Sequence, residues 1–255
     1  MSFSYNPIRS RNIFSSINDA PFKISRSKIE DFLKCPRCFF LDRKCGTGQP
    51  PSYPFTLNNA VDALLKKEFN KYRVAQVSHP LCLEYGVNAI PFSHPDLDDW
   101  RMNQRGIQYL HEPTNFCITG AVDDVWINAE NEELIIVDYK ATSSREEITL
   151  DAEYRQSYKR QMEIYQWLFR KNGFRVSETG YFVYCNGDTE KDEFRGNLVF
   201  KITLLPYKGD DSWIDGTLHD IRSCLERSTL PVLSDTCSYC QYWLAVSNHA
   251  EKRIL

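Results

Sequence analysis

The sequence lacks any long run of apolar residues. No stretch approaches the roughly 18 residues that a membrane-spanning helix needs, so we expect no membrane span. The opening segment, MSFSYNPIRSRNIF, lacks the basic-then-apolar order of a secretory signal peptide. No internal repeat and no low-complexity segment is visible, which argues against a repeat architecture. We therefore expect an intracellular, cytoplasmic protein.

An excess of positive charge is also missing. The chain has 31 Lys and Arg against 34 Asp and Glu, a formal net charge of −3, and a sequence pI near 6.0. This balance argues against a protein that coats nucleic acid through a strongly basic surface. It leaves room for an enzyme with a local basic groove and an acidic metal site. Apolar residues make up 42% of the sequence, which is enough for a buried core.

Cysteine, in contrast, is plentiful, with nine residues. An odd count without a signal peptide argues against a disulfide framework. Four of these cysteines are isolated among apolar or mixed neighbours, and we expect them to be small buried hydrophobic residues. These are Cys82, Cys117, Cys185 and Cys224.

Two Cys-x-x-Cys pairs lie near the two ends of the sequence: Cys35 with Cys38, and Cys237 with Cys240. Each short spacing lets two thiolates point at one ion, and two such pairs complete a tetrahedral site. Such a site would be structural, and by closing a long loop it would favour the folded state. Cys45 is a candidate substitute ligand, but its position in a loop favours a free thiol.

The first half of the chain reads as helices and loops. Residues 1–26 are expected to form a loosely ordered arm, and Ser27 with Glu30 forms a capping-box pattern that opens a helix. A Gly/Pro-rich loop at 46–54 precedes an amphipathic helix at 57–72 with six apolar residues at helical spacing. Those residues are Leu57, Val61, Leu64, Leu65, Phe69 and Tyr72. Residues 74–113 are expected to be an insertion of short helices and loops.

The second half alternates strands and helices. The pattern predicts strands at 115–128 and 133–140 joined by a hairpin turn, a helix at 154–171, strands at 180–187 and 197–205, and a helix at 211–227. This order predicts an α/β sandwich around a mixed sheet. We expect residues 27–245 to form one domain, followed by a tail at 246–255.

The strongest chemical signal is the pair Asp138 and Lys140 at the end of the apolar run IIV. Residues two apart on a strand share a face, and isolated charges next to a buried strand are costly. The preceding strand supplies Asp123 and Asp124, only one of which can face the same way. Two carboxylates on adjacent strands can hold Mg²⁺, and a lysine can assist an attacking water. The alternative at this point is a structural ion pair.

These motifs resemble the PD-(D/E)xK nucleases. Gly120-x-x-Asp123, a turn, and then an apolar strand ending in Asp138-x-Lys140 match the pattern of that family. The following helix carries Gln161-x-x-x-Tyr165, which is similar to the RecB-like branch that includes AddB and the CRISPR spacer-acquisition nucleases. The resemblance implies a restriction-endonuclease-like core with a mixed β-sheet flanked by helices.

The resemblance also implies the roles of particular residues. Asp123, Asp138 and the backbone carbonyl of Tyr139 would bind Mg²⁺ or Mn²⁺, and Lys140 would be the catalytic lysine. Gln161 and Tyr165 would flank the site and orient Lys140 or the scissile phosphate. The family usually has a histidine on the first long helix. Here Asp62 stands in its place, and an aspartate is an acceptable ligand for either ion.

Relatives in this branch often carry an iron–sulfur cluster that bridges the two ends of the domain. Their usual arrangement is one N-terminal and three C-terminal cysteines, whereas this chain has two and two. The resemblance makes an iron–sulfur cluster the first expectation for the four cysteines. The different arrangement of the cysteines leaves zinc as the alternative, because four thiolates suit either group.

The implied function is hydrolysis of phosphodiester bonds in nucleic acid, with DNA as the expected substrate. Many relatives work with a helicase, so a helicase or another recombination, repair or defence protein is a candidate partner. Basic residues of the two long helices are candidates for phosphate contacts: Lys66, Lys67, Lys71, Arg73, Arg155, Lys159 and Arg160. Two alternatives remain open. One is a catalytically inactive nucleic-acid or protein-binding module, and the other is a redox-sensing iron–sulfur protein.

Overall fold

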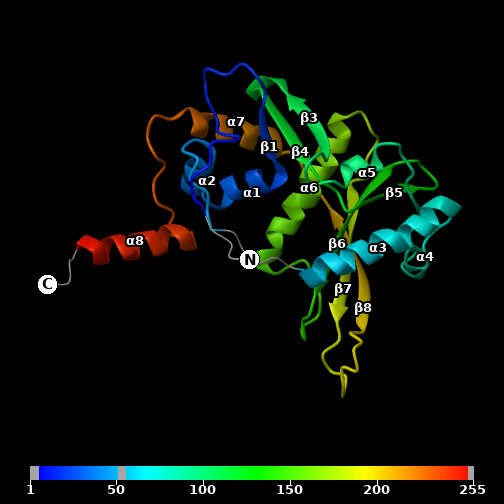
Figure 1. Cartoon of the computed structure of the whole chain (residues 1–255). Helices are drawn as coiled ribbons and strands as arrows, with labels where there is room; N and C mark the ends of the chain where they lie inside the picture. The colour runs from blue at the N-terminus through cyan, green and yellow to red at the C-terminus, as the bar shows by residue number, and fades with distance from the viewer. Residues whose placement is uncertain (1–5, 51–55, 252–255) are drawn as a thin grey trace. The chain divides into compact units, whose positions relative to one another are not determined.

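The computed structural model describes residues 6–50 and 56–251, and the chain forms two compact units (Figure 1). Unit 1 comprises Met1–Tyr53, Leu110–Ile118 and Ser212–Leu255. Unit 2 comprises Pro54–Tyr109 and Thr119–Asp211. Both the N-terminal and the C-terminal segments of the sequence therefore contribute to unit 1.

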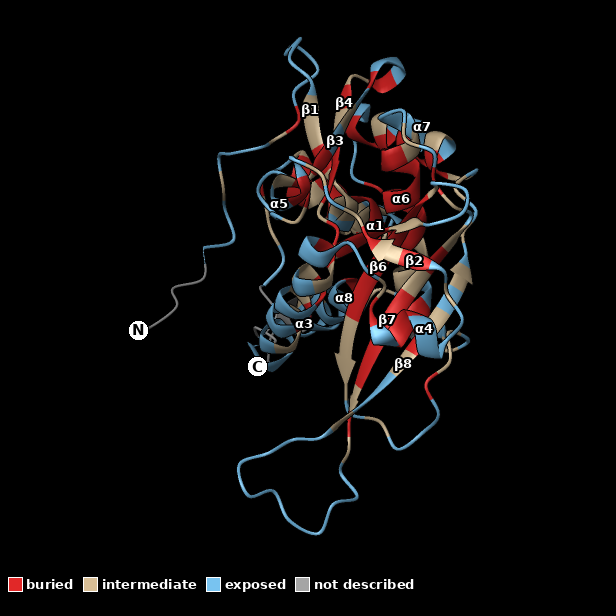
Figure 2. Ribbon diagram, turned by 90° about the vertical axis from the view of Figure 1, so that its right-hand side faces the viewer, coloured by how far each residue is buried: buried red, intermediate tan, exposed pale blue. Residues whose placement is uncertain are grey.

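Unit 2 is built on a five-stranded sheet with the order β2-β5-β6-β7-β8. Only β6 and β7 are parallel, while the other neighbours are antiparallel, so the sheet is mixed as predicted. The strands are β2 (Ala89–Pro91), β5 (Asp124–Asn128), β6 (Leu134–Thr142), β7 (Thr179–Gly187) and β8 (Phe200–Lys208). The central strands β6 and β7 are buried along most of their length (Figure 2).

Two long helices pack against this sheet, α3 (Thr56–Ala75) and α6 (Gln156–Lys171). On α3, Leu65 and Phe69 are buried in one core cluster with Trp126, Val137 and Tyr139 of the sheet. Because side chains alternate along a strand, Asp138 and Lys140 lie on the opposite face of β6, where they contact α6. The sheet therefore has one helix on each face.

The apolar stripe of α3 is narrower than predicted. Leu57 and Leu64 are 60% and 62% exposed, although both belong to the predicted stripe. Leu64 lies about 100° around the helix from Leu65 and misses the sheet, and Leu57 belongs to an exposed first turn. Only the row through Leu65 and Phe69 is buried in the core.

The region between α3 and β4 contains more strand than predicted. The short helices α4 (Pro80–Glu84) and α5 (Leu97–Trp100) are present as expected. The strands β2 and β3 (Ile107–His111) were not predicted. The alternating run at 115–128 is also two strands, β4 (Phe116–Gly120) and β5, because the chain leaves the extended ladder between them. Asp123 lies in that break rather than in a strand.

Unit 1 contains mainly helices. Its helices are α1 (Arg26–Lys34), α2 (Pro36–Arg43), α7 (Ile214–Glu226), α8 (Ser238–Glu251) and the 3₁₀ turn η1 (Glu112–Thr114). A second 3₁₀ turn, η2 (Glu153–Arg155), precedes α6 in unit 2. A three-stranded sheet has the order β1-β4-β3, where β1 is Phe22–Ser25. α7 packs against α1 and α2.

The predicted capping box at Ser27 is wrong. The extended strand β1 continues to Ser25, which is the residue before α1, and Ser27 lies inside the helix. The side chain of Ser25 forms no capping hydrogen bond with the helix. The hydroxyl of Ser25 instead lies 2.9 Å from the hydroxyl of Ser27. Residues 51–54 of the predicted Gly/Pro-rich loop and residues 1–5 of the predicted arm lie outside the described residues.

Candidate active site and four-cysteine cluster

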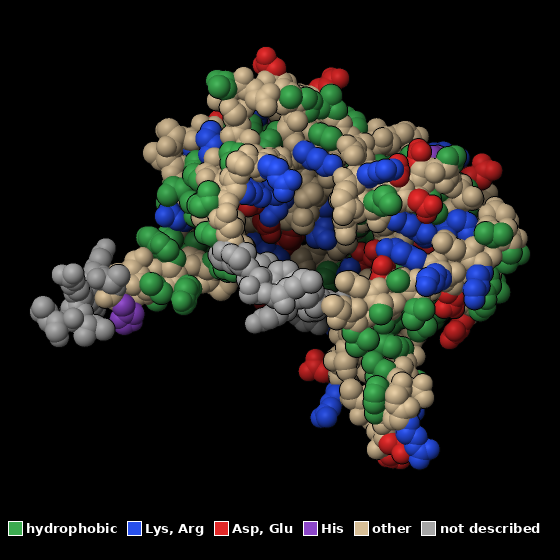
Figure 3. Space-filling view, viewed as in Figure 1, with side chains coloured by type: hydrophobic (Ala, Val, Ile, Leu, Met, Phe, Trp, Pro, Cys, Tyr) green, Lys and Arg blue, Asp and Glu red, His purple; other side chains and the backbone are tan. Residues whose placement is uncertain are grey.

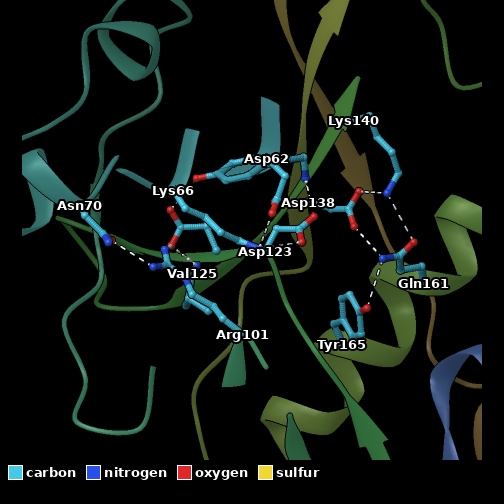
Figure 4. A network of polar contacts seen from close by, with 12 residues as sticks. Asp62, Lys66, Asn70, Arg101, Asp123, Val125, Asp138, Lys140, Gln161 and Tyr165 are labelled. Atoms are coloured by element: carbon cyan, nitrogen blue, oxygen red, sulfur yellow. Dashed lines mark hydrogen bonds and ion pairs between the residues drawn. The ribbon is translucent and has the colours of Figure 1, made fainter. Parts of the chain in front are cut away.

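Asp138 and Lys140 form an ion pair on the α6 side of β6 (Figure 4). The side chain of Gln161 joins them, since its Nε2 donates to Asp138 Oδ1 at 2.7 Å and its Oε1 accepts from Lys140 Nζ at 3.4 Å. The same Nε2 lies 3.1 Å from the hydroxyl of Tyr165, one turn further along α6. The structure thus brings together all four residues that the sequence singles out on these two elements.

Asp123 and Asp124 face different surroundings. Asp123 Oδ2 accepts a hydrogen bond of 2.9 Å from the backbone N–H of Tyr139, which lies between Asp138 and Lys140 on β6. The side chain of Asp124 is fully buried and accepts 2.7 Å hydrogen bonds from the hydroxyl of Tyr139 and from Arg101. Of the two acids, only Asp123 therefore lies against the backbone between Asp138 and Lys140, and its role as a metal ligand stays a prediction.

Tyr139 also presents its backbone to the site. The N–H and C=O of one strand residue point to the same side, so its carbonyl faces the side on which Asp123 lies. The ladder between β5 and β6 ends at the pair Asp124 and Val137. The strand β5 therefore does not pair with Tyr139, and the role of its carbonyl as a metal ligand stays a prediction.

Asp62 reaches the site from α3, where the family usually has a histidine. Lys66, one turn further on the same helix, lies 2.9 Å from Asp62 Oδ2 and 3.5 Å from Asp123 Oδ1. The other oxygen of Asp62 is buried, and none of the described residues donates a hydrogen bond to it. Burial raises the pKa of Asp62, the negative charge of Asp123 raises it further, and Lys66 opposes both effects.

Lys140 is protonated at neutral pH in this environment. Burial by itself lowers the pKa of an ammonium group. The carboxylates of Asp138 and Asp123 outweigh burial, so the pKa of Lys140 lies above its ordinary value. A lysine whose charged form is favoured by two carboxylates can stabilise negative charge that develops on a phosphate.

The donor set suits a hard divalent cation. Three carboxylates and one carbonyl are all oxygen ligands, which Mg²⁺ and Mn²⁺ prefer. The buried, unpartnered oxygen of Asp62 is available to such an ion. Among the described residues, only the four cysteines form a group of three or more ligands within 4.8 Å of one another. The three carboxylates are therefore spread more widely than the cysteines.

A buried network around Asp124 was not predicted. Arg73 of α3 and Arg101, the residue after α5, both form ion pairs with Asp124, and Asn70 bonds both arginines. Arg73 is buried, so the prediction that it contacts phosphate is wrong. No spacing rule identifies such a network, because its members come from three separate elements.

The other basic residues of the long helices vary in exposure. Lys67 and Lys71 are exposed, whereas Arg155 is buried and bonds the carbonyl of Thr149. Figure 3 shows Lys and Arg side chains over the part of unit 2 that holds α3. Contacts of Lys67 and Lys71 with phosphate stay a prediction, whereas the prediction for the buried Arg155 is wrong for the same reason as for Arg73.

The four cysteines of unit 1 meet as predicted. Sulfur–sulfur distances are 3.6 Å for Cys35 and Cys240, 3.7 Å for Cys38 and Cys237, and 3.9 Å for Cys38 and Cys240. All four sulfurs lie within 4.8 Å of one another, so they could hold a metal ion or a cluster. The sulfurs belong to the start of α2 and the start of α8, and Cys45 is exposed outside the group.

The surroundings shift the pKa values of three of these thiols in different directions. Burial raises the pKa of Cys35 and of Cys38. Burial also raises the pKa of Cys237, but the backbone N–H of Cys240 and the thiols of Cys38 and Cys35 outweigh it, so the net pKa is lowered. Its surroundings therefore favour the thiolate form, unlike those of Cys35 and Cys38. Of the isolated cysteines, Cys82, Cys185 and Cys224 are buried as expected, and Cys117 is half-buried.

A mixed sheet with an acid–lysine pair within its central strand, flanked by two helices, defines a nuclease-like α/β protein. A family model described as the PD-(D/E)XK nuclease superfamily matches residues 56–244. The chain therefore belongs to the PD-(D/E)XK nuclease superfamily. No curated protein matches the sequence. No helix within the described residues is both long and apolar enough to span a bilayer.

Proposed function

We propose that this protein is a metal-dependent nuclease of the RecB-like branch that hydrolyses phosphodiester bonds in DNA. The observation that carries the proposal is the convergence of Asp62, Asp123 and Asp138 from three elements beside Lys140. A structural ion pair between Asp138 and Lys140 alone would not require two further acids at the same place. Nor would it leave an oxygen of Asp62 buried without a partner among the described residues.

Asp62, Asp123, Asp138 and the carbonyl of Tyr139 would hold Mg²⁺ or Mn²⁺. Such an ion would polarise the scissile phosphodiester and lower the pKa of the attacking water. The backbone N–H of Tyr139 fixes the carboxylate of Asp123. That bond ties the geometry of one ligand to the strand that carries Asp138.

The remaining site residues act on substrate and water in this proposal. Lys140 carries the positive charge that stabilises the phosphate as negative charge builds up on it. Gln161 fixes the side chains of Asp138 and Lys140 relative to each other through its two hydrogen bonds. The hydroxyl of Tyr165, bonded to Gln161, lies on the same helix and orients Gln161 toward the site.

The four cysteines would hold an iron–sulfur cluster, with structural Zn²⁺ as the alternative. Four thiolates suit both groups. In either case the group would bind α2 and α8 together within unit 1. We further propose that residues 27–245 act as one domain in the cytoplasm, with a helicase or another recombination, repair or defence protein as partner.

A catalytically inactive module that binds nucleic acid or protein is the second candidate. Two observations favour it. Asp62 replaces the usual histidine, and Lys66 lies against both Asp62 and Asp123. An intact set of Asp123, Asp138 and Lys140 argues against it, because a binding module would need none of the three.

The test is cleavage of end-labelled single- and double-stranded DNA with Mg²⁺ or Mn²⁺ by protein purified without oxygen. Lys140→Ala should lower the rate by at least about 100-fold, the scale at which removal of one stabilising charge acts. Lys208→Ala is the matched control, because Lys208 is an exposed residue of β8 that pairs with Glu178.

No cleavage by the wild-type protein with its cysteine-bound group intact would overturn the enzymatic function and leave the binding module. Equal rates for the wild type and Lys140→Ala would refute the assigned role of Lys140. Cleavage of RNA but not DNA would correct the substrate.

A further inference from the structure

The ammonium group of Lys66 lies between the carboxylates of Asp62 and Asp123, where a metal ion bound by both would lie. Its ammonium group is 2.9 Å from Asp62 Oδ2 and 3.5 Å from Asp123 Oδ1. Its side chain is 23% exposed, so it is partly shielded from water yet has room to move. Figure 4 shows the three side chains converging from α3 and from the segment before β5.

The charges of the site explain why a lysine is found there. Asp62, Asp123 and Asp138 bring three negative charges together, and like charges in a partly buried place repel one another. Lys140 pairs with Asp138, and Lys66 pairs with the other two. A histidine at position 62 would be neutral or positive and would not need Lys66 in this way. The two residues one turn apart on α3 thus form a matched pair.

The spacing of the ligands points the same way. Oxygens around one Mg²⁺ ion lie about 2.0–2.1 Å from it, so any two of them are at most about 4.2 Å apart. Asp62, Asp123 and Asp138 do not form a group with ligand atoms all within 4.8 Å of one another among the described residues. The three carboxylates must therefore move closer together when an ion binds. The ammonium group of Lys66 contacts two of them, Asp62 and Asp123, where the ion would bind.

We propose that Lys66 is a built-in counter-ion that competes with the divalent metal for Asp62 and Asp123, and that it must leave them when the metal binds. The inference rests on the proposed function, because it assumes that these carboxylates hold the ion. Its consequence is a weakened metal site: part of the binding free energy is used to displace Lys66. The side chain of Lys66 thereby sets the concentration of metal at which the site fills.

The experiment is a titration of the full chain, with its cysteine-bound group in place, with Mn²⁺, followed by the electron paramagnetic resonance signal of the free ion. Lys66→Gln removes the competing charge and should tighten Mn²⁺ binding by about threefold to fivefold, the upper part of the range for a partly exposed ion pair. Lys66→Met, which keeps the aliphatic length, should do the same. Lys66→Arg keeps the charge and should bind Mn²⁺ as the wild type does.

Lys67→Gln is the matched control, since it removes the same charge from the next residue of α3, where the side chain is exposed. It should leave Mn²⁺ affinity within about twofold of the wild type, because an exposed charge is well screened. A merely structural role for Lys66 would leave metal affinity unchanged or weaken it. Unchanged or weaker binding in both Lys66→Gln and Lys66→Met overturns the inference.

Asp138→Asn separates this inference from the proposed function. Loss of Mn²⁺ binding in Asp138→Asn together with unchanged affinity in the Lys66 variants would refute only the role of Lys66. Mn²⁺ binding by Asp138→Asn that equals the wild type would refute the metal site itself.

Discussion

Asp123 and Asp124 are adjacent in the sequence, but the structure gives them different environments. Asp123 lies at the proposed metal site, and 25% of its side chain is exposed. Asp124 is fully buried between Arg73 and Arg101. Because successive residues near a strand point to opposite faces, one backbone segment supplies both a candidate ligand and a structural ion pair.

This difference in environment predicts that Asp124→Asn mainly lowers stability, whereas Asp123→Asn mainly lowers cleavage activity. Asp124→Asn leaves two buried arginines without their counter-charge and should lower the free energy of unfolding by about 3 kcal/mol or more. Asp123→Asn should change that free energy by less than about 1 kcal/mol and abolish DNA cleavage. Urea unfolding followed by tyrosine and tryptophan fluorescence, together with the cleavage assay, measures both. Equal loss of stability in the two variants would contradict the division of roles.

The residues that could be predicted from sequence are those in short, local patterns. Asp138 with Lys140, and Gln161 with Tyr165, lie two and four positions apart, so the strand and helix periods place each pair on one face. Arg101 was not identified in this way, and Lys66 was predicted only as a phosphate contact and not as a partner of Asp62 and Asp123. Their importance depends on which residues of other elements come to lie beside them, and no local period encodes that.

At the scale of the elements, Gly120 controls how closely β4 approaches α6. A methyl group at this position would lie 2.7 Å from Cε1 of Tyr165 and 2.9 Å from Cδ1 of Leu168. In the sequence this glycine stands out only as part of the Gly120-x-x-Asp123 motif. The close approach found in the structure is to the side chains of α6, and so to the helix that carries Gln161.

Gly120→Ala should therefore push Tyr165 and α6 away from the strand. We expect a loss of about 1–3 kcal/mol in the free energy of unfolding, the usual cost of overpacking, and slower DNA cleavage. Gly216→Ala on α7 is the control, because a methyl group there meets nothing within 4 Å, and alanine favours a helix by up to about 1 kcal/mol. Urea unfolding of both variants checks this, and a Gly120→Ala protein as stable as the wild type would refute it.

Element type was more predictable than element boundaries. The helices α3 and α6 and the hairpin of β5 and β6 follow from strong periodicity over many residues. The strands β2 and β3 are only three and five residues long, too short for an alternating pattern to stand out. The start of α1 was missed because a nearby serine and glutamate matched a cap, whereas strand β1 actually runs to Ser25.

At the scale of the whole molecule, the four cysteines connect segments that are 199 or more positions apart in the sequence. A metal ion or cluster bound there would join two segments of unit 1 and close a very long loop that contains the whole sequence of unit 2, and closing such a loop is costly in entropy. The pairing of the two Cys-x-x-Cys motifs was predictable because each motif is local and the two are equally spaced. The identity of the bound group was not, because four thiolates accept either zinc or iron–sulfur.

Removal of the cysteine-bound group should destabilise the chain. Cys240→Ser should lower the metal content, and the melting temperature should fall by roughly 5–10 °C, as expected when a few kcal/mol are lost in a chain of this size. Cys45→Ser, at an exposed cysteine outside the group, should change neither. Metal analysis, the visible absorption spectrum and thermal unfolding test this. Equal melting temperatures in the two variants would rule out a structural group at the four cysteines.

The central claim is that cleavage depends on a divalent ion held by Asp62, Asp123 and Asp138. The most direct test measures Mn²⁺ occupancy and DNA cleavage on the same preparation, before and after Mn²⁺ is removed and then restored. We expect the cleavage rate to rise in parallel with Mn²⁺ occupancy, and Asp138→Asn to abolish both. Removal of the ion should stop cleavage, and its return should restore it. Cleavage that continues without the ion, or in Asp138→Asn, would contradict it.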